Sequence, residues 1–305
     1  MGVAYFSQRL VVTVVTLWAI ATLTFFMMRA VPGGPFDAEK DLPPAVRANL
    51  EARYHLDWPL WRQYLDYLRR VAVWDLGPSF TYPNRTVNDI VAEGFRVSAA
   101  LGALAIAVAL VAGVGVGVLA ALYHDRWPDR AAMLGATLGV SVPNFILSGL
   151  LIYLFAYRLR WLPAGLWGRP DQAVMPALAL AALPTAVIAR LVRANLLEVL
   201  RQDFITVCHA KGLSPARVVF VHALRSAILP VITYLGPLAA GVLTGSFVVE
   251  HIFAIPGLGK YFVQSVTNRD YTVIMGVTMF YSVLLVVANA LVDLAYRAVD
   301  PRIRL

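Results

Sequence analysis

Histidines, one cysteine and a glycine-rich turn are the residues of this chain best able to do chemistry. The sequence contains no HExxH, Gly-x-Ser-x-Gly or Walker-type motif, and the PGLGK turn at 256–260 lacks the Ser or Thr of a phosphate-binding loop. The single cysteine, Cys208, excludes an internal disulfide. The histidines lie far apart along the chain: His55, His124, His209, His222 and His251. We therefore predict no catalytic, cofactor-binding or metal-binding residue in this chain.

Charged groups beside apolar segments form a second class of candidates. Asp293 and Arg297 are four residues apart at a predicted helix end, a spacing typical of a structural ion pair. Arg190 and Arg193 follow an apolar run, so we expect their heads to reach the membrane interface.

Uncharged polar side chains within apolar segments form a third class. Such groups either line a polar pathway or hydrogen-bond to a neighbouring helix, and the sequence leaves both readings open. We name three as candidates for a translocation path: Ser141, Asn144 and Asn289. Asn195 has the same character.

Residues 198–230 are the longest polar interruption in the second half of the chain. They predict a first short helix over roughly 195–210, ended by Lys211-Gly212, because glycine adopts the left-handed cap conformation without a Cβ penalty. A second helix should start at Ser214-Pro215, a capping serine before proline, and run to Leu229-Pro230.

This loop carries two apolar groups. They are Phe204, Ile205 and Val207 in the first helix, and Val218, Val219 and Val221 in the second. If exposed, they would form an apolar patch of the kind that marks a partner surface. Docking of such a helix into a groove is a common mode of recognition.

The composition places these elements in a membrane. The chain has 305 residues, 59% hydrophobic and 14% charged, with a mean hydropathy of +0.68, so a multi-span membrane protein is expected. No small-residue cleavage site follows the first apolar run, which predicts a retained span. Six spans are predicted, giving an all-α polytopic fold: 10–28, 97–123, 131–157, 173–189, 226–249 and 272–292.

The sequence also predicts an extramembrane segment, a broken span and sites of close helix packing. The segment 31–95 is polar and should lie outside the membrane, with amphipathic helices at 42–56 and 58–74 and a short polar helix at 87–93. The third span should break at 141–144, and a short helix should follow Pro256-Gly257. Four glycines of the second span would allow another helix to approach closely: Gly102, Gly113, Gly115 and Gly117.

Basic residues in the short loops predict the orientation. With the N-terminus inside, the inner loops and tails hold twelve lysines and arginines and the short outer loops hold five. Both termini and the 198–228 loop should therefore face the cytoplasm. The strongly basic charge thus has a membrane explanation, and no nucleic-acid partner is predicted.

The polar loop also resembles a known family. Its sequence FITVCHAKGLSPARVVFVHALRSAILP is similar to the cytoplasmic loop of ABC importer membrane subunits, in particular the peptide-permease branch. Matching positions are Phe204, Ile205, Ala210, Lys211, Gly212, Leu213, His222, Ala223, Leu224, Arg225, Leu229 and Pro230; departures are Thr206, Val207, Cys208 and His209.

The resemblance extends along nearly the whole chain, to the B-type membrane component of bacterial oligopeptide permeases, in the peptide/nickel permease family. It rests on TFFMMRAVPGGPF, LPPAVRANLEARYHLD, DLGPSFTYPNRTVNDIVAEGFRVSAALGA, VVEHIFAIPGLGK, NRDY and VDLAYRAVDPRIRL. It implies a type I ABC importer transmembrane domain in the bacterial cytoplasmic membrane. The implied divisions are an N-terminus with helix 1 (1–30), an extracytoplasmic insertion (31–95), a five-helix core (96–295) and a cytoplasmic tail (296–305).

The resemblance also implies partners and a mechanism. The partners would be a homologous second permease subunit, two cytoplasmic ATPases that bind ATP and Mg, and an extracytoplasmic peptide-binding protein that meets segment 31–95 and loop 250–270. The ATPase-coupling residues would be Phe204, Ile205, Thr206, Val207, Cys208, Ala210, Lys211, Gly212 and Leu213. Oligopeptides would cross by alternating access, driven by ATP bound in the partner subunits.

Other functions remain open at this stage. A dipeptide or nickel permease shares the loop and the DPRIR tail. A membrane scaffold or receptor without transport is a different class, against which the Pro and Gly breaks in several spans argue. An intramembrane enzyme would need a catalytic pair at membrane depth, and the sequence offers none.

Overall fold

The computed structural model describes residues 3–32, 49, 51–243 and 246–299. Every regular element in these residues is helical, and backbone pairing outside the helices is limited there to an isolated bridge between Pro78 and Thr86. The helices fall into two compact units, residues 1–96 with 257–286 and residues 97–256 with 287–305. The predicted all-α class is confirmed.

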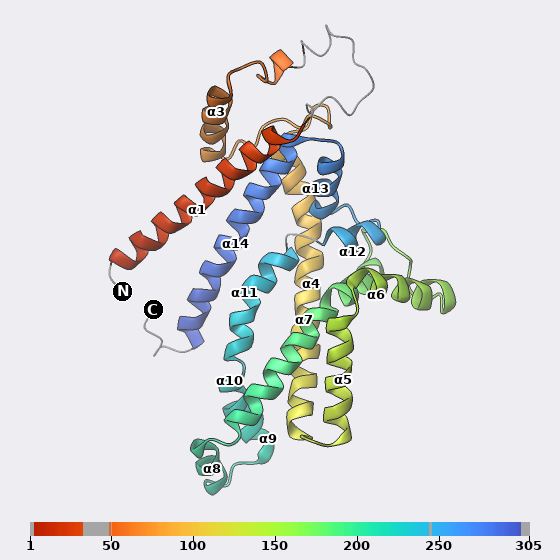
Figure 1. The fold of residues 1–305 in the computed structure, drawn as a ribbon. Helices are drawn as coiled ribbons and strands as arrows, with labels where there is room; N and C mark the ends of the chain where they lie inside the picture. The colour runs from red at the N-terminus through yellow and green to blue at the C-terminus, as the bar shows by residue number, and fades with distance from the viewer. Residues whose placement is uncertain (1–2, 33–48, 50, 244–245, 300–305) are drawn as a thin grey trace. The chain divides into compact units, whose positions relative to one another are not determined.

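Apolar helices of membrane-spanning length account for most of the described chain (Figure 1). Four are single helices: Ser7–Ala30 within α1 (Val3–Ala30), α4 (Val87–Leu122), α7 (Pro170–Val199) and Tyr271–Leu291 within α14 (Tyr271–Val299). Two more are bent pairs, Trp127–Ser141 with Asn144–Arg158 at 107° and Pro215–Ala227 with Leu229–Leu243 at 51°. Counting each pair as one span gives the six that the sequence predicts.

The break in the third span has a local cause. Val142 separates α5 (Trp127–Ser141) from α6 (Asn144–Leu151) and adopts φ −86° and ψ 117°. Helical geometry is disfavoured for a residue before proline, and Pro143 cannot donate a helical hydrogen bond. The predicted break at 141–144 is therefore confirmed, and α6 continues into the π-helical turn η1 (Ile152–Arg158).

Other boundaries differ from the sequence-based expectation. α4 is one continuous helix that contains both the polar helix expected at 87–93 and the span expected from residue 97. Gly94 lies inside this helix and packs against Leu258. The helix expected at 58–74 is α3 (Leu60–Ala72), and the helix after Pro256-Gly257 is α13 (Leu258–Thr267). Most of the helix expected at 42–56, the side chains of the expected pair Asp293 and Arg297, and the last six residues of the tail lie outside the described set.

The first unit combines α1, α3, the start of α4, α13 and most of α14. One buried cluster joins the loop after α3 to α4 and α14 through Leu76, Ile90 and Val277. A second is aromatic and includes Phe25 and Tyr271. The loop after α3 is thus part of the packed core of this unit.

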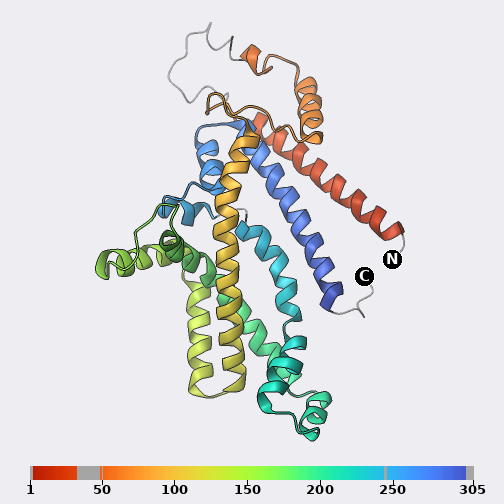
Figure 2. The ribbon, with the colours of Figure 1, turned by 180° about the vertical axis from the view of Figure 1, so that it is seen from behind.

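The second unit is built on α7, which has the longest buried face of its helices. α5, α6, α10 (Leu224–Ala227), α11 (Leu229–Leu243) and α12 (Phe247–Ile252) all contact it (Figures 1 and 2). A Cβ on Gly113 would lie 2.8 Å from Ile188, and one on Gly117 would lie 2.7 Å from Ala189 O. Gly102 is equally close to α11, since a Cβ there would lie 2.9 Å from Val242 O. The expected close helix approach is confirmed for these three glycines, whereas Gly115 faces no atom within 4 Å.

Candidate functional site

The polar loop after α7 lies at one end of the second unit and contains the short helix α8 (Asp203–Ala210), a glycine turn and the short helix α9 (Pro215–Arg217) (Figure 1). α7 runs to Val199, so the expected single helix over 195–210 is wrong: a turn separates α7 from α8. Gly212 has φ +72°, the left-handed conformation expected of it. Ser214 Oγ accepts from Arg217 N at 3.4 Å and caps α9, as the sequence predicts.

α8 has one face inside the unit and one outside. Ile205 is 5% exposed and packs in the main core, and Cys208 and Leu213 pack against the same core. Phe204 is 37% exposed and Val207 is 51% exposed. Thr206, Ala210, Lys211 and Gly212 are also exposed. The helix is therefore anchored through one apolar side and presents a second apolar side outward.

The second half of the loop follows the same division. Val218 and Val219, in the π-helical turn η2 (Val218–Ala223), are buried, and Phe220 and Val221 are more than half exposed. The expectation that Ile205, Val218 and Val219 belong to an exposed patch is wrong, because these side chains complete the core around α7. The large apolar residues that are exposed on the two contacting elements α8 and η2 are Phe204, Val207, Phe220 and Val221.

A network of charged groups ties α7 to the turn before α5. Asp129 is buried, and its two oxygens accept from Arg193 Nε at 2.6 Å and Nη2 at 2.7 Å. Asp129 Oδ2 also accepts from Asp125 N at 2.9 Å. Arg193 makes a bidentate ion pair two turns before the end of α7. The expectation that its head reaches the membrane interface stays a prediction. A charged residue beside an apolar segment usually has an ionic partner, so the position of Arg193 was the sequence signal for this pair.

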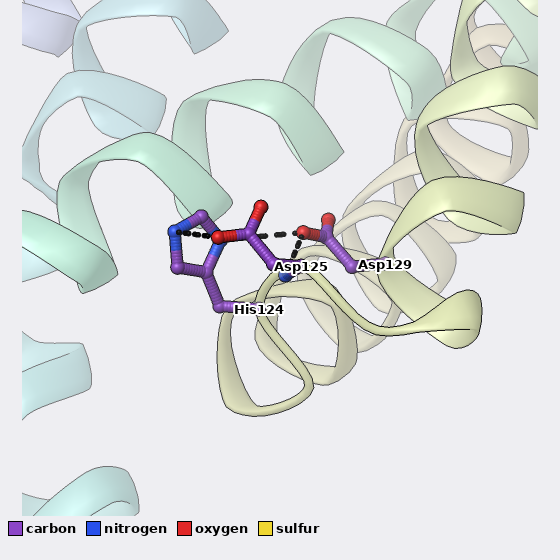
Figure 3. A group of neighbouring side chains, drawn as sticks. All are labelled: His124, Asp125 and Asp129. Atoms are coloured by element: carbon purple, nitrogen blue, oxygen red, sulfur yellow. Dashed lines mark hydrogen bonds and ion pairs between the residues drawn. The ribbon is translucent and has the colours of Figure 1, made fainter.

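The same turn brings together three potential metal ligands, His124, Asp125 and Asp129 (Figure 3). Their ligand atoms all lie within 4.8 Å of one another. His124 Nδ1 lies 3.1 Å from Arg193 Nη2, and Nε2 lies 3.3 Å from Asp125 Oδ2. His124 Nδ1 also lies 3.3 Å from Asp129 Oδ2. The guanidinium of Arg193 already neutralises Asp129, so this arrangement suits an internal ion-pair network better than a cation site.

The candidate path residues occupy different settings. Ser141 ends α5 and donates its hydroxyl to Thr137 O at 2.8 Å within its own helix. Asn144 begins α6 on the other side of the break, and its backbone carbonyl accepts a hydrogen bond from Ser148 Oγ at 2.7 Å. Asn289 lies exposed on α14. Ser141 and Asn144 thus flank the same bend, and no hydrogen bond joins either to Asn289 within the described residues.

Two fully buried carboxylates were missed by sequence reasoning. In the first unit, Asp270 accepts from Ser79 Oγ at 2.5 Å, from Thr81 N at 3.0 Å and from Val273 N at 3.2 Å. Phe80 N and Thr272 Oγ1 also donate to it. In the second unit, Glu250 Oε1 accepts from Ser98 Oγ at 2.7 Å. An isolated acidic residue within an apolar stretch, as in VVEHI, is the signal that could have identified Glu250.

Comparison with known proteins connects this geometry to a family. A family model described as "Binding-protein-dependent transport system inner membrane component" matches residues 113–305. The dipeptide transport system permease protein DppB of Bacillus subtilis is 52% identical over 301 residues, covering 99% of this chain and 98% of DppB. The oligopeptide transport system permease protein OppB of Haemophilus influenzae is 45% identical over 303 residues, covering 98% of this chain and 99% of OppB.

Solved structures agree on the fold. An inward-facing conformation of the MetNI methionine ABC transporter contains a chain that matches 69% of this chain and 96% of its own length, with a TM-score of 0.58 and 21% identity. An amino acid ABC transporter matches 69% of this chain and 94% of its own, with a TM-score of 0.53 and 19% identity. At these identities, the likeness concerns the fold alone.

Proposed function

This chain belongs to the family of binding-protein-dependent transport system inner membrane components, and we propose that it is the permease subunit of an ATP-driven importer of oligopeptides. The relatives that resemble it along nearly their full length are named as oligopeptide and dipeptide permeases. The all-helical fold with up to six spans suits a membrane permease. The observation that carries the proposal is α8, held by Ile205 in the core while Phe204 and Val207 remain outside.

Dipeptides are the second candidate substrate, because the 52% identical relative is a dipeptide permease. Uptake into proteoliposomes containing the complete importer separates the two. An excess of unlabelled pentapeptide should abolish uptake of a labelled pentapeptide, and an excess of dialanine should leave it nearly unchanged. Uptake of labelled dialanine without any uptake of the labelled pentapeptide would assign the dipeptide class.

The outward face of α8 is the proposed docking surface for an ATPase subunit. Phe204, Val207 and Lys211 lie three or four residues apart, so they share one face of the helix. Thr206, Ala210 and Gly212 flank this face, and Ile205, Cys208 and Leu213 anchor the helix from behind. A short helix with an apolar face suits the helix-in-groove mode.

The contacts inside the second unit give a route for movement. Force on α8 reaches the core through Ile205, and it reaches α7 through the turn at 200–202. Arg193 fastens α7 to the turn before α5 through Asp129, and Arg190 Nη2 donates to Thr137 Oγ1 of α5 at 3.2 Å. A pull on the loop should therefore move α7 and α5 together, as alternating access requires.

The family resemblance also suggests the partner subunits of the importer. The complete importer would contain a homologous second permease subunit, two ATPases that bind ATP and Mg, and an extracytoplasmic peptide-binding protein. The excess of basic residues in the inner loops favours a cytoplasmic position for both termini and the 198–228 loop. Ser141 and Asn144, at the bend between α5 and α6, and Asn289 are the proposed contacts along the path.

Co-purification tests the assembly. The chain is tagged in its host, extracted in mild detergent, and its partners are identified by mass spectrometry. We expect two ATPase subunits and a second six-span permease. Recovery of the chain alone or as a homo-oligomer, without an ATPase, would refute the proposal.

A further inference from the structure

A cavity of about 140 Å³ lies within the first unit, remote in sequence from the loop after α7. Its walls are the last turns of α1, the turn at 53–58, α3, the loop at 75–80 and the first turns of α14. The lining side chains include Phe25, Arg29, Arg53, Gln63, Tyr67 and Arg70. The volume is more than one water molecule needs.

Gln63, which lines this cavity, has an unused acceptor. Its Nε2 donates to Leu56 O at 3.1 Å and to Trp58 O at 2.7 Å. Reversing the amide would place its oxygen against two carbonyl oxygens, so the orientation is fixed. Gln63 Oε1 is then buried without a hydrogen-bond partner in the part of the chain that the structure describes.

Tyr67 supplies a second unused group. Its hydroxyl is the other buried side-chain atom that lacks a partner among the described residues, and it lines the same cavity. Burial raises the pKa of Tyr67 well above its ordinary value, so the phenol stays protonated and can both donate and accept. Buried polar groups in proteins are nearly always satisfied, so two in one cavity indicate a missing partner.

The charges around the cavity favour an anion. Arg70 pairs with Asp66 at 2.8 Å and lies 3.8 Å from Asp75. Arg29 and Arg53 form no ion pair with any described residue; their guanidinium groups lie over the rings of Phe25, at 5.3 Å, and Tyr54, at 5.9 Å. As far as the described residues go, the wall therefore holds two cations without a matching anion.

The remaining wall is apolar and aromatic. The rings of Phe25 and Tyr67 stack with centroids 5.7 Å apart, and those of Tyr54 and Phe80 meet at 4.7 Å. A pocket with an apolar wall and a few convergent polar groups is typical of a small-molecule site.

We propose that this cavity binds the polar end of a small amphipathic molecule that carries an oxyanion and a hydrogen-bond donor. The oxyanion would lie toward Arg29 and Arg53 and accept from Tyr67 Oη, and the donor would satisfy Gln63 Oε1. Two sources share this chemistry. One is the phosphate and ammonium of a phosphatidylethanolamine headgroup beside α1, whose apolar surface is largely exposed; the other is the carboxylate and N–H of a free short peptide.

Two arms of one experiment distinguish the sources, using the complete importer without its binding protein. In the lipid arm, native mass spectrometry compares retention of phosphatidylethanolamine with phosphatidylcholine, whose headgroup has no N–H donor. In the peptide arm, calorimetry in phosphatidylcholine nanodiscs compares glycyl-phenylalanine with its C-terminal amide, which has no carboxylate. We expect one arm to show preference for the first ligand of its pair.

Variants assign the binding to the cavity. Tyr67→Phe removes one oxygen and keeps the ring, and it should weaken binding by about tenfold, as expected for loss of one buried hydrogen bond to a charged group. Arg29→Gln should weaken it at least as much. Arg69→Gln, on the exposed side of α3, is the matched control and should bind as the wild type does.

Either of two results would overturn the proposal. Absence of preference in both arms would mean that the cavity holds water only. Preference that is unchanged in Tyr67→Phe and Arg29→Gln would place the ligand elsewhere. Neither result bears on peptide transport, since no arm measures uptake.

Discussion

The loop after α7 and the loop after α3 are both polar segments between helices, and they are held in different ways. The first is anchored by apolar side chains such as Ile205 and Val218 and leaves Phe204 and Val207 exposed. The second closes around Asp270, whose carboxylate collects five donors within its own unit. One loop leaves an apolar face exposed, while the other has its central carboxylate satisfied internally.

The difference predicts where substitutions act on folding and where they act on transport. Changes at Asp270 should damage the fold of the first unit. Changes on the outer face of α8 should leave the fold intact and uncouple transport.

Asp270→Ala should have the largest effect on stability. It removes the acceptor of five hydrogen bonds and leaves buried donors such as Ser79 Oγ and Val273 N unsatisfied. Because each unsatisfied group costs about 1–3 kcal/mol, the free energy of unfolding should fall by about 4 kcal/mol or more. Thermal unfolding of the purified protein measures this, and a change within about 0.5 kcal/mol, typical of a surface substitution, would contradict it.

Gly212→Pro should abolish transport while the protein remains inserted in the membrane. Gly212 has φ +72°, which proline cannot adopt, and its N–H donates to His209 O at 2.9 Å. Peptide uptake and ATPase activity of the complete importer measure the effect. Gly115→Ala, where a Cβ meets no atom within 4 Å, is the matched control and should transport normally. Normal uptake by Gly212→Pro would refute the role of the loop.

Two substitutions on α8 should separate anchoring from docking. Ile205→Ala should lower the free energy of unfolding by about 2–3 kcal/mol, as is usual for truncation in a core. Val207→Asp should change it by less than about 0.5 kcal/mol, because the side chain is exposed, yet reduce uptake by about tenfold or more through burial of an unpaired carboxylate in the partner groove. Equal effects of both variants on stability would contradict the two-faced helix.

The smallest effect concerns alkaline pH. Burial raises the pKa of Tyr67 above its ordinary value of 10.0. A raised pKa favours the neutral phenol in the folded state, so its contribution to stability is present below pH 10 and declines above it. Stability should therefore fall less steeply above pH 10 in Tyr67→Phe than in the wild type. Parallel pH profiles of thermal unfolding would contradict this.

The sequence predicted the helical class, the spans and the turn chemistry well. Gly212, Ser214 and Pro143 act through local backbone rules, which a single sequence displays directly. Hydropathy likewise located the apolar segments that the structure shows as long helices or bent pairs.

Side-chain direction and long-range polar pairing were not predictable in the same way. Hydrophobicity alone does not tell Ile205 from Val207, because core and partner surface are both apolar. The ion pair of Asp129 with Arg193 and the donors around Asp270 join residues far apart in sequence, so only the folded chain shows which partners meet. The cavity at Gln63 and Tyr67 has no local sequence signature for the same reason.

The accessibility of residue 207 reports whether an ATPase subunit covers the outer face of α8. With the single native cysteine replaced by Cys208→Ser, the variant Val207→Cys provides a unique thiol on the outer face of α8. Maleimide should label it rapidly in the chain purified without ATPase subunits, and assembly with those subunits should protect it. Equal labelling in both preparations would show that the outer face of α8 is not the surface that the ATPase covers.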